Sequence, residues 1–151
     1  MGSTASHALC AEKPVLITIL RAGLPLCYGV HKIFSDSEVG YLGMARNEET
    51  LQPKTDYIAI PNVRDKCVII IDTMIATGGS ILDAIRIVEK QGPKKIIVIG
   101  AIAAEAGIAK IVEYNPNIKI YAAAIDPQLN EKGYIIPGLG DAGDRCYGQK
   151  E

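Results

Sequence analysis

Four short apolar runs, rich in β-branched residues, constrain the fold of this chain more than any other feature. They are Val15–Leu20, Cys67–Asp72, Lys95–Ile102 and Ile118–Ala123. Continuous runs of this kind, without regular polar alternation, suit strands that are buried on both faces, as in a parallel sheet. We therefore expect four buried strands.

Segments with helical periodicity lie between these runs. Gly78–Gln91 carries apolar residues on one face and charged residues on the other, and Gly92 and Pro93 end it. Glu105–Tyr114 repeats the pattern, and Leu24–Phe34 is a third expected helix. Alternating strands and helices predict an α/β fold, with an open, mostly parallel sheet and helices on both faces.

Two segments do not follow this alternation. Val39–Ile60 has two extended stretches around the polar turn Arg46–Lys54, and we expect a strand followed by a projecting β-hairpin arm. Asp126–Gly148 contains five glycines and two prolines. We expect it to be a long functional loop without regular structure. With no repeat or linker in the chain, we predict one domain over residues 15–151, preceded by a poorly ordered leader over residues 1–14.

Charge and cysteine content exclude several classes of function. Lys and Arg number 16 against 17 Asp and Glu, and this net charge of −1 provides no field to attract nucleic acid or an anionic membrane. Any anionic ligand must therefore be bound by local groups. The four cysteines lie far apart, without metal-ligand spacing. This pattern is typical of reduced thiols in a cytoplasmic protein.

The most informative stretch runs from Val68 to Ser80, a buried strand followed by Asp72, a short loop and Thr-Gly-Gly-Ser at the start of a helix. Ligands of open α/β sheets bind at the carboxyl ends of strands. The two glycines allow backbone N–H groups to surround phosphate oxygens, and the helix N-terminus adds partial positive charge. Thr77 and Ser80 can add hydroxyl donors. No Lys follows the glycines, so this is not a loop for cleaving nucleoside triphosphates.

This stretch predicts a cradle for a monophosphate, with Asp72 placed to hydrogen-bond ribose hydroxyls. The simpler alternative is an N-capped helix after a glycine turn. That alternative explains one glycine and one hydroxyl, but not the whole string.

The Asp72–Ser80 string resembles the loop of uracil phosphoribosyltransferases that binds phosphoribosyl diphosphate (PRPP). Three other segments resemble the same family in order. Ile19–Leu24 resembles its pyrophosphate-contacting loop, and Arg46–Leu51 resembles its second arginine segment. Ile125–Arg145 resembles its uracil-binding region. The resemblance extends from about Val15 to Gly148.

Within the last motif, Gly138, Gly140 and Gly143 also match the spacing of the dinucleotide-binding fingerprint. That fingerprint requires a strand before it, a helix after it and a complete βαβ unit. Only eight residues follow Gly143, so we reject the dinucleotide interpretation.

The resemblance implies an enzyme, a pentosyltransferase that makes UMP and pyrophosphate from uracil and PRPP. It gives catalytic roles to Asp72, Arg21 and Asp141. It implies that PRPP is bound by Arg21, Arg46, Asp72, Thr73, Met74, Ile75, Ala76, Thr77, Gly78, Gly79, Ser80 and Asp141. It implies that uracil is bound by Ile135, Gly140, Asp141 and Ala142. Mg²⁺ is expected on the PRPP, close to Asp141, rather than in a protein cage, because Mg²⁺ retains water and phosphate ligands.

Simpler roles exist for the charged residues. Arg21 and Arg46 could each form a surface salt bridge, and Asp141 and Asp144 could each cap a turn. Main-chain groups are chemically suited to uracil, which presents an acceptor, a donor and an acceptor along one edge. Cytosine would leave buried groups of such an array unpaired.

Two other functions remain open at this point. One is a regulatory protein on the same fold that senses PRPP or UMP with little or no turnover. The other is transfer to another base, although the family's purine and orotate relatives commonly carry a second acid directly beside the position of Asp72.

The chain also departs from the family pattern in three places. Thr73 replaces a usual Pro, and Glu105-Ala106 replaces a usual Pro-Glu. Only fourteen residues precede Val15, where the family has several tens of mostly helical residues. A parallel sheet needs both faces covered, so we expect a homodimer or larger homo-oligomer, in which a partner also buries the Val39–Ile60 arm.

Overall fold

Six strands form the main sheet of the computed structural model, which describes residue 4, residues 12–46 and residues 53–149. Their order is β3-β2-β1-β4-β5-β6, and all neighbouring strands are parallel except β2 and β3. The strands are β1 (Val15–Leu20), β2 (Val39–Arg46), β3 (Pro53–Ala59), β4 (Cys67–Ile75), β5 (Lys95–Ala104) and β6 (Lys119–Asp126). The predicted open, mostly parallel sheet is confirmed.

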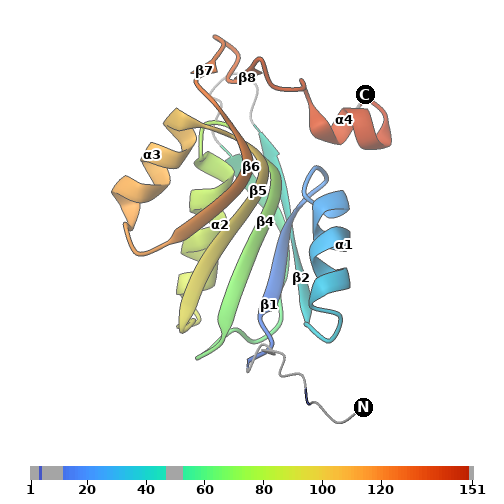
Figure 1. Cartoon of the computed structure of the whole chain (residues 1–151), viewed down its shortest axis with the longest axis vertical. Helices are drawn as coiled ribbons and strands as arrows, with labels where there is room; N and C mark the ends of the chain where they lie inside the picture. Colours follow the sequence, from blue (N-terminus) through green and yellow to red (C-terminus); the bar gives the residue numbers. More distant parts are fainter. Residues whose placement is uncertain (1–3, 5–11, 47–52, 150–151) are drawn as a thin grey trace.

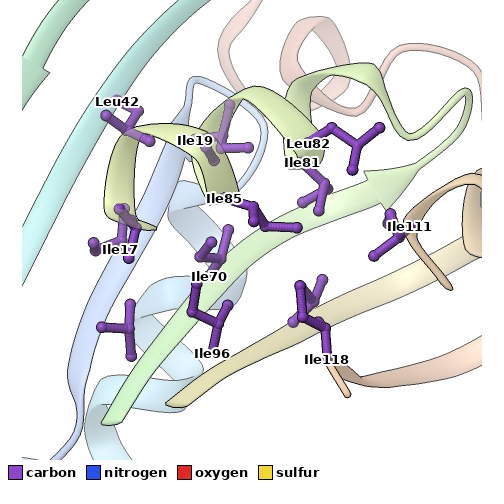
Figure 2. Packing of buried hydrophobic residues seen from close by; sticks show 14 of the residues in the cluster. Ile17, Ile19, Leu42, Ile70, Ile81, Leu82, Ile85, Ile96, Ile111 and Ile118 are labelled. Carbon is purple, nitrogen blue, oxygen red and sulfur yellow. The ribbon is translucent and has the colours of Figure 1, made fainter. Parts of the chain in front are cut away.

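Helices cover both faces of this sheet, as predicted (Figure 1). They are α1 (Leu24–Ile33), α2 (Gly79–Glu89) and α3 (Glu105–Tyr114). Because successive strand residues point to opposite faces, the strands contribute to two cores. Ile69 and Ile71 pack with α1 on one face, whereas Ile70 packs with α2 and α3 on the other. Figure 2 shows the second core, in which Ile85 of α2 and Ile111 of α3 lie above β4 and β5.

One of the four predicted buried strands is not buried. None of the residues of β6 is fully buried, and Tyr121 and Ile125 are 56% and 57% exposed. The reason is that β6 is an edge strand with β5 as its one partner in the sheet order. Ile120 and Ala122 pack against the α2–α3 core, but Tyr121 and Ile125 belong to neither buried cluster. An apolar run therefore identified a strand correctly but not its burial.

The predicted hairpin arm lies at the other edge of the sheet. β2 runs parallel to β1, and β3 pairs antiparallel with β2 from Tyr41 opposite Ala59 to Arg46 opposite Pro53. The tip of the predicted turn, residues 47–52, lies outside the described residues. Most of the predicted leader, residues 1–3 and 5–11, lies outside them too.

The prediction that Asp126–Gly148 lacks regular structure is wrong in part. This segment contains the short strands β7 (Gln128–Leu129) and β8 (Ile135–Ile136), which pair antiparallel, and the helix α4 (Ala142–Tyr147). A side-chain acceptor supports the hairpin turn, because Asn130 Oδ1 accepts hydrogen bonds from the backbone N–H groups of Lys132 and Tyr134. Glycines allow the turns between elements, with φ of 74° at Gly133 and 81° at Gly140.

β7, β8 and α4 lie beyond the end of the sheet at which β4 and β6 finish (Figure 1). The carboxyl ends of the parallel strands and the glycine-rich segment therefore meet at one end of the molecule. None of the helices in the described part of the chain is long and apolar enough to cross a membrane.

Candidate active site

The loop between β4 and α2 forms the first wall of the candidate site. β4 continues to Ile75, three residues beyond its predicted end at Asp72, and α2 begins at Gly79. Gly78 is the N-cap of α2, has a left-handed φ of 75° and provides no side-chain cap. The simpler alternative, an N-capped helix after a glycine turn, is therefore present only in part: the glycine turn is there, but no side chain caps the helix. A helix start without a side-chain cap is suited to an anion, because its N–H groups and dipole favour negative charge.

Two glycines allow this loop to pack directly on the start of α3. A Cβ atom at Gly78 would lie 2.8 Å from the backbone oxygen of Gly107. A Cβ atom at Gly107 would overlap the backbone oxygen of Ala76 and lie 3.0 Å from that of Ile75. The main chain of the loop therefore lies directly against the main chain at the start of α3, and this contact supports the cradle.

A pocket of about 170 Å³ lies against this loop. Three parts of the chain line it: the β4–α2 connection, the β1–α1 loop and the C-terminal segment. The lining residues are Ala22, Asp72, Met74, Ile75, Ala76, Thr77, Gly78, Gly79, Ser80, Ile81, Gly133, Tyr134, Gly140, Asp141 and Ala142. Three of the four motifs found in the sequence thus converge on one cavity. Its two charged residues, among those the structure describes, are Asp72 and Asp141, so the wall itself contributes no Lys or Arg.

Asp72 is a buried acid in the wall of this pocket, with only 8% of its surface exposed. Burial raises the pKa of its carboxyl group to about 7, although hydrogen bonds from the backbone of Met74 and Thr73 lower the pKa in part. The charged form is disfavoured because the ordinary solvation of a carboxylate is lost. A ligand that brings hydroxyl donors or positive charge to Asp72 would compensate for this loss.

Thr73 does not line the pocket, and its side chain supports the β1–α1 loop. Its Oγ1 donates a hydrogen bond of 2.5 Å to the backbone oxygen of Ala22, which does line the pocket. The next residue, Gly23, has no room for a side chain, because a Cβ atom there would lie 2.6 Å from Thr18 Oγ1 and 2.7 Å from the Ile71 oxygen. The residue that departs from the family pattern therefore connects two of the predicted motifs.

Arg21 does not line the pocket. Its guanidinium Nη2 lies 2.6 Å from Asp144 Oδ1, and both Nη atoms lie 3.4 Å from the backbone oxygen of Gly148. Asp141 lines the pocket and is also the N-cap of α4, because its Oδ1 accepts the N–H of Asp144 at 2.9 Å. The simpler roles considered for Arg21 and Asp141 are thus both present in this structure. Asp144, for which capping was the simpler alternative, forms an ion pair with Arg21.

The pocket contains most, but not all, of the predicted site residues. Thr73 and Ile135 do not line it: Thr73 donates a hydrogen bond to Ala22, and Ile135 of β8 is buried at 2% exposure. The side chain of Arg46 lies outside the described part of the structure. Tyr134 and Gly133 line the pocket although sequence reasoning did not select them. Both residues directly precede Ile135 in the predicted uracil-binding motif, and this position is the sequence feature that could have identified them as pocket residues.

A family model described as "Uracil phosphoribosyltransferase" matches residues 1–149. The match therefore includes the segment that sequence analysis separated as a leader. Two proteins named uracil phosphoribosyltransferase are similar over 99% of this chain, at 42% identity in Shouchella clausii and 44% in Halalkalibacterium halodurans. The chain spans 72% of the length of each of these relatives.

A solved structure of a protein from Aquifex aeolicus has a TM-score of 0.88 and 44% identity, and covers 91% of this chain. The chain spans 66% of that structure, slightly less than two thirds. A purine phosphoribosyltransferase from Pyrococcus horikoshii has a TM-score of 0.57 at 19% identity. This match covers 75% of the present chain and 69% of the chain from Pyrococcus horikoshii. At this identity, the likeness concerns the fold alone.

Proposed function

Because the chain belongs to the uracil phosphoribosyltransferase family, we propose that it transfers the ribosyl phosphate group of PRPP to uracil. The bond between the anomeric carbon and the diphosphate breaks, and a bond from that carbon to N1 of uracil forms. The N1 proton is released, and the products are UMP and pyrophosphate. The observation that carries the proposal is the meeting of the phosphate cradle, Asp72 and the C-terminal glycine-rich segment in one pocket.

The cradle between β4 and α2 would hold the 5′-phosphate of PRPP. Support comes from the uncapped start of α2 at Gly78 and from the presence of Thr77, Gly79 and Ser80 in the pocket wall. Since the wall has no cationic side chain among the described residues, backbone N–H groups and the helix dipole are the available counter-charges. This arrangement holds a monophosphate in place and leaves its ester bond intact.

Asp72 would act on the ribose ring. Its carboxyl group can accept hydrogen bonds from ribose hydroxyls, and these donors would replace the solvation that burial removes. Positive charge develops on the ring as the diphosphate leaves, and a nearby carboxylate stabilises that charge. The raised pKa means that Asp72 gains more from such partners than an exposed carboxylate would.

The β1–α1 loop would contact the diphosphate, with Ala22 in the wall of the pocket and Arg21 beside that wall.

We include Mg²⁺ as the counter-ion of the diphosphate. The donor set fits a metal that the substrate carries: two carboxylates, Asp72 and Asp141, line the pocket. Among the described residues, no group of three or more His, Cys, Asp or Glu could form a cage. Mg²⁺ would supply charge neutralisation of the leaving diphosphate.

Uracil would bind against the main chain around Ile135, Gly140 and Ala142. Support comes from the tight local geometry: a Cβ atom at Gly138 would overlap the backbone oxygen of Ile135, and the Gly138 N–H donates to Asp126 Oδ2 at 3.0 Å. A segment held in this way presents backbone groups in fixed directions. Fixed donors and acceptors distinguish uracil from cytosine, because a mismatched base leaves buried groups unpaired.

We further propose that the protein is cytoplasmic and forms a homodimer or larger homo-oligomer. Cys27, which is buried, and Cys146, which is exposed, are free thiols, which suits a reducing compartment. An oligomer is supported by the exposed apolar side chains on β6 and β3, Tyr121 and Tyr57.

The decisive experiment is an assay of UMP formation from uracil, PRPP and Mg²⁺, with cytosine, hypoxanthine and orotate in parallel. We expect UMP and pyrophosphate in equal amounts and no product with the other bases. Binding of PRPP without turnover would instead indicate a regulatory protein. Turnover of another base would refute the assignment to uracil.

A further inference from the structure

Helix α4 packs on the β1–α1 loop, although the two are far apart in the sequence. Arg21 Nη2 and Asp144 Oδ1 lie 2.6 Å apart, although the two residues are separated by 123 positions in the sequence. A Cβ atom at Gly143 would lie 3.8 Å from both Ala22 N and Arg21 Nη2, so the backbone of α4 lies against the loop. The contact thus has two parts, one ionic and one of ordinary van der Waals packing at Gly143.

The same contact joins two walls of the pocket. Ala22, next to Arg21, comes from the β1–α1 loop. Asp141 comes from the C-terminal segment, and its Oδ1 accepts the N–H of Asp144. Within one turn of α4, Asp141 therefore lines the pocket while Asp144 holds the loop. A displacement of α4 would move both walls together.

We propose that Asp144 is a positioning residue, which orients the Arg21 guanidinium for the diphosphate and joins the diphosphate side of the pocket to the base side. This proposal rests on the proposed function. The catalytic contact belongs to Arg21, and Asp144 acts through it.

The geometry indicates that Asp144 orients Arg21 rather than blocking its access to the diphosphate. A guanidinium group has five N–H donors in a planar fork; Asp144 engages one Nη atom at 2.6 Å, and the Gly148 oxygen lies at a longer 3.4 Å from both Nη atoms. The Arg21 side chain is 39% exposed, so it can receive diphosphate oxygens while it remains paired. An arginine already held in one orientation loses less side-chain entropy when the diphosphate binds.

Asp144→Asn preserves the shape of the side chain and removes the charge-assisted bond. We expect the KM for PRPP to rise roughly three- to tenfold, with kcat changed less than twofold. A purely structural role would lower the melting temperature without this division between KM and kcat. Asp144→Glu keeps the carboxylate on a longer side chain, and its KM should lie between those of the wild type and Asp144→Asn.

Asp83→Asn is the matched control. Asp83 pairs with Arg86 at 2.9 Å, and its side chain is 30% exposed, against 29% for Asp144. Asp83 lies on α2 and does not line the pocket. Removing this ion pair should leave the KM for PRPP unchanged.

A double-mutant cycle tests whether Asp144 acts through Arg21. In an Arg21→Gln background, Asp144→Asn should have no further effect on PRPP affinity. Calorimetric titration with PRPP makes the measurement independent of turnover. Equal or tighter binding of PRPP by Asp144→Asn, or an undiminished effect without Arg21, would overturn the proposal.

The binding measurement also separates this proposal from the proposed function. A wild-type protein that binds PRPP but makes no UMP would contradict the function, and the effect of Asp144→Asn on binding would still decide the role of Asp144. A wild-type protein that does not bind PRPP would contradict both.

Discussion

At the scale of single residues, Asp72 combines a role at the site with an effect on stability. Its pKa rises from an ordinary 3.8 to about 7 in the folded chain, so the folded state binds a proton more tightly than the unfolded state. Below about pH 4 both states are protonated, and Asp72 has no net effect on stability. Between about pH 4 and pH 7 the unfolded state ionises first, and the free energy of unfolding falls. The total fall in the free energy of unfolding over this pH range is about 4 kcal/mol at most.

We therefore predict that Asp72→Asn becomes more stable relative to the wild type as pH rises from 4 to 8. Urea unfolding at several pH values should show this relative gain in unfolding free energy, levelling off above about pH 7. The amide has its own desolvation penalty, but that penalty does not depend on pH. A stability difference independent of pH would contradict the raised pKa.

The same substitution tests the role of Asp72 in the reaction. Because an amide cannot stabilise positive charge on the ribose ring as a carboxylate does, we expect UMP formation to fall tenfold or more. Kinetics identical to those of the wild type in the folded variant would exclude this role.

Thr73 has a positioning role that its hydroxyl alone can fulfil. Its Oγ1 donates to the Ala22 oxygen at 2.5 Å, and Ala22 lines the pocket. Thr73→Val keeps the shape of the side chain but leaves this carbonyl without its donor. We expect a loss of roughly 1 kcal/mol in unfolding free energy and a several-fold loss in kcat/KM for PRPP.

Thr73→Ser is the control, because it retains the hydroxyl. It should stay close to the wild type in both measurements. If Thr73→Val matches Thr73→Ser, the hydrogen bond to Ala22 does not support the loop.

At the scale of elements, the cradle depends on the approach of the β4–α2 loop to the start of α3. Gly78 has a positive φ, and a Cβ atom there would lie 2.8 Å from the Gly107 oxygen. We predict that Gly78→Val remains folded but loses measurable PRPP binding, because the branched side chain displaces the loop that forms the phosphate site. Calorimetric titration with PRPP measures the loss.

Gly92→Val separates displacement of the loop from strain of the backbone. Gly92 has a similar φ of 70°, but a Cβ atom there meets nothing within 4 Å. Both variants should be less stable than the wild type, and only Gly78→Val should lose PRPP. Equal PRPP affinity of the two variants would show that the cradle tolerates the side chain.

At the scale of the whole molecule, the two faces of the sheet are covered unequally. α2 and α3 pack on one face, whereas in the described part of the chain α1 is the helix that packs on the other (Figure 1). Tyr121 on β6 remains 56% exposed as a result, and Tyr57 on β3 is 55% exposed. Apolar side chains exposed in this way favour association with another copy.

We predict that sedimentation at micromolar concentration gives a homodimer or a larger species. Tyr121→Lys and Tyr57→Lys should each shift the equilibrium toward the monomer. Val112→Lys is the control, because Val112 lies on α3 and is 44% exposed. A wild-type protein that is an active monomer would show that these side chains need no cover.

The sequence by itself determined the elements and most members of the site. β1 and α3 have the predicted bounds, because an apolar run or a helical period is a property of neighbouring residues. The predicted cradle residues from Met74 to Ser80 lie together along one pocket, because they are consecutive in a strand, a turn and a helix start. Local patterns are sufficient wherever the contacts are local.

Only the tertiary structure decided which strands are buried and which side chains face the pocket. β6 has an apolar sequence but lies at an edge, and edge position depends on strand order. Thr73 faces Ala22, and Arg21 pairs with Asp144, because residues distant in sequence meet there. The helix α4 begins at a cap that Asp141 supplies, although the composition of its segment favoured a loop. In each case, contacts between distant or capping groups outweighed the local pattern, because burial and hydrogen bonding depend on which neighbours the fold provides.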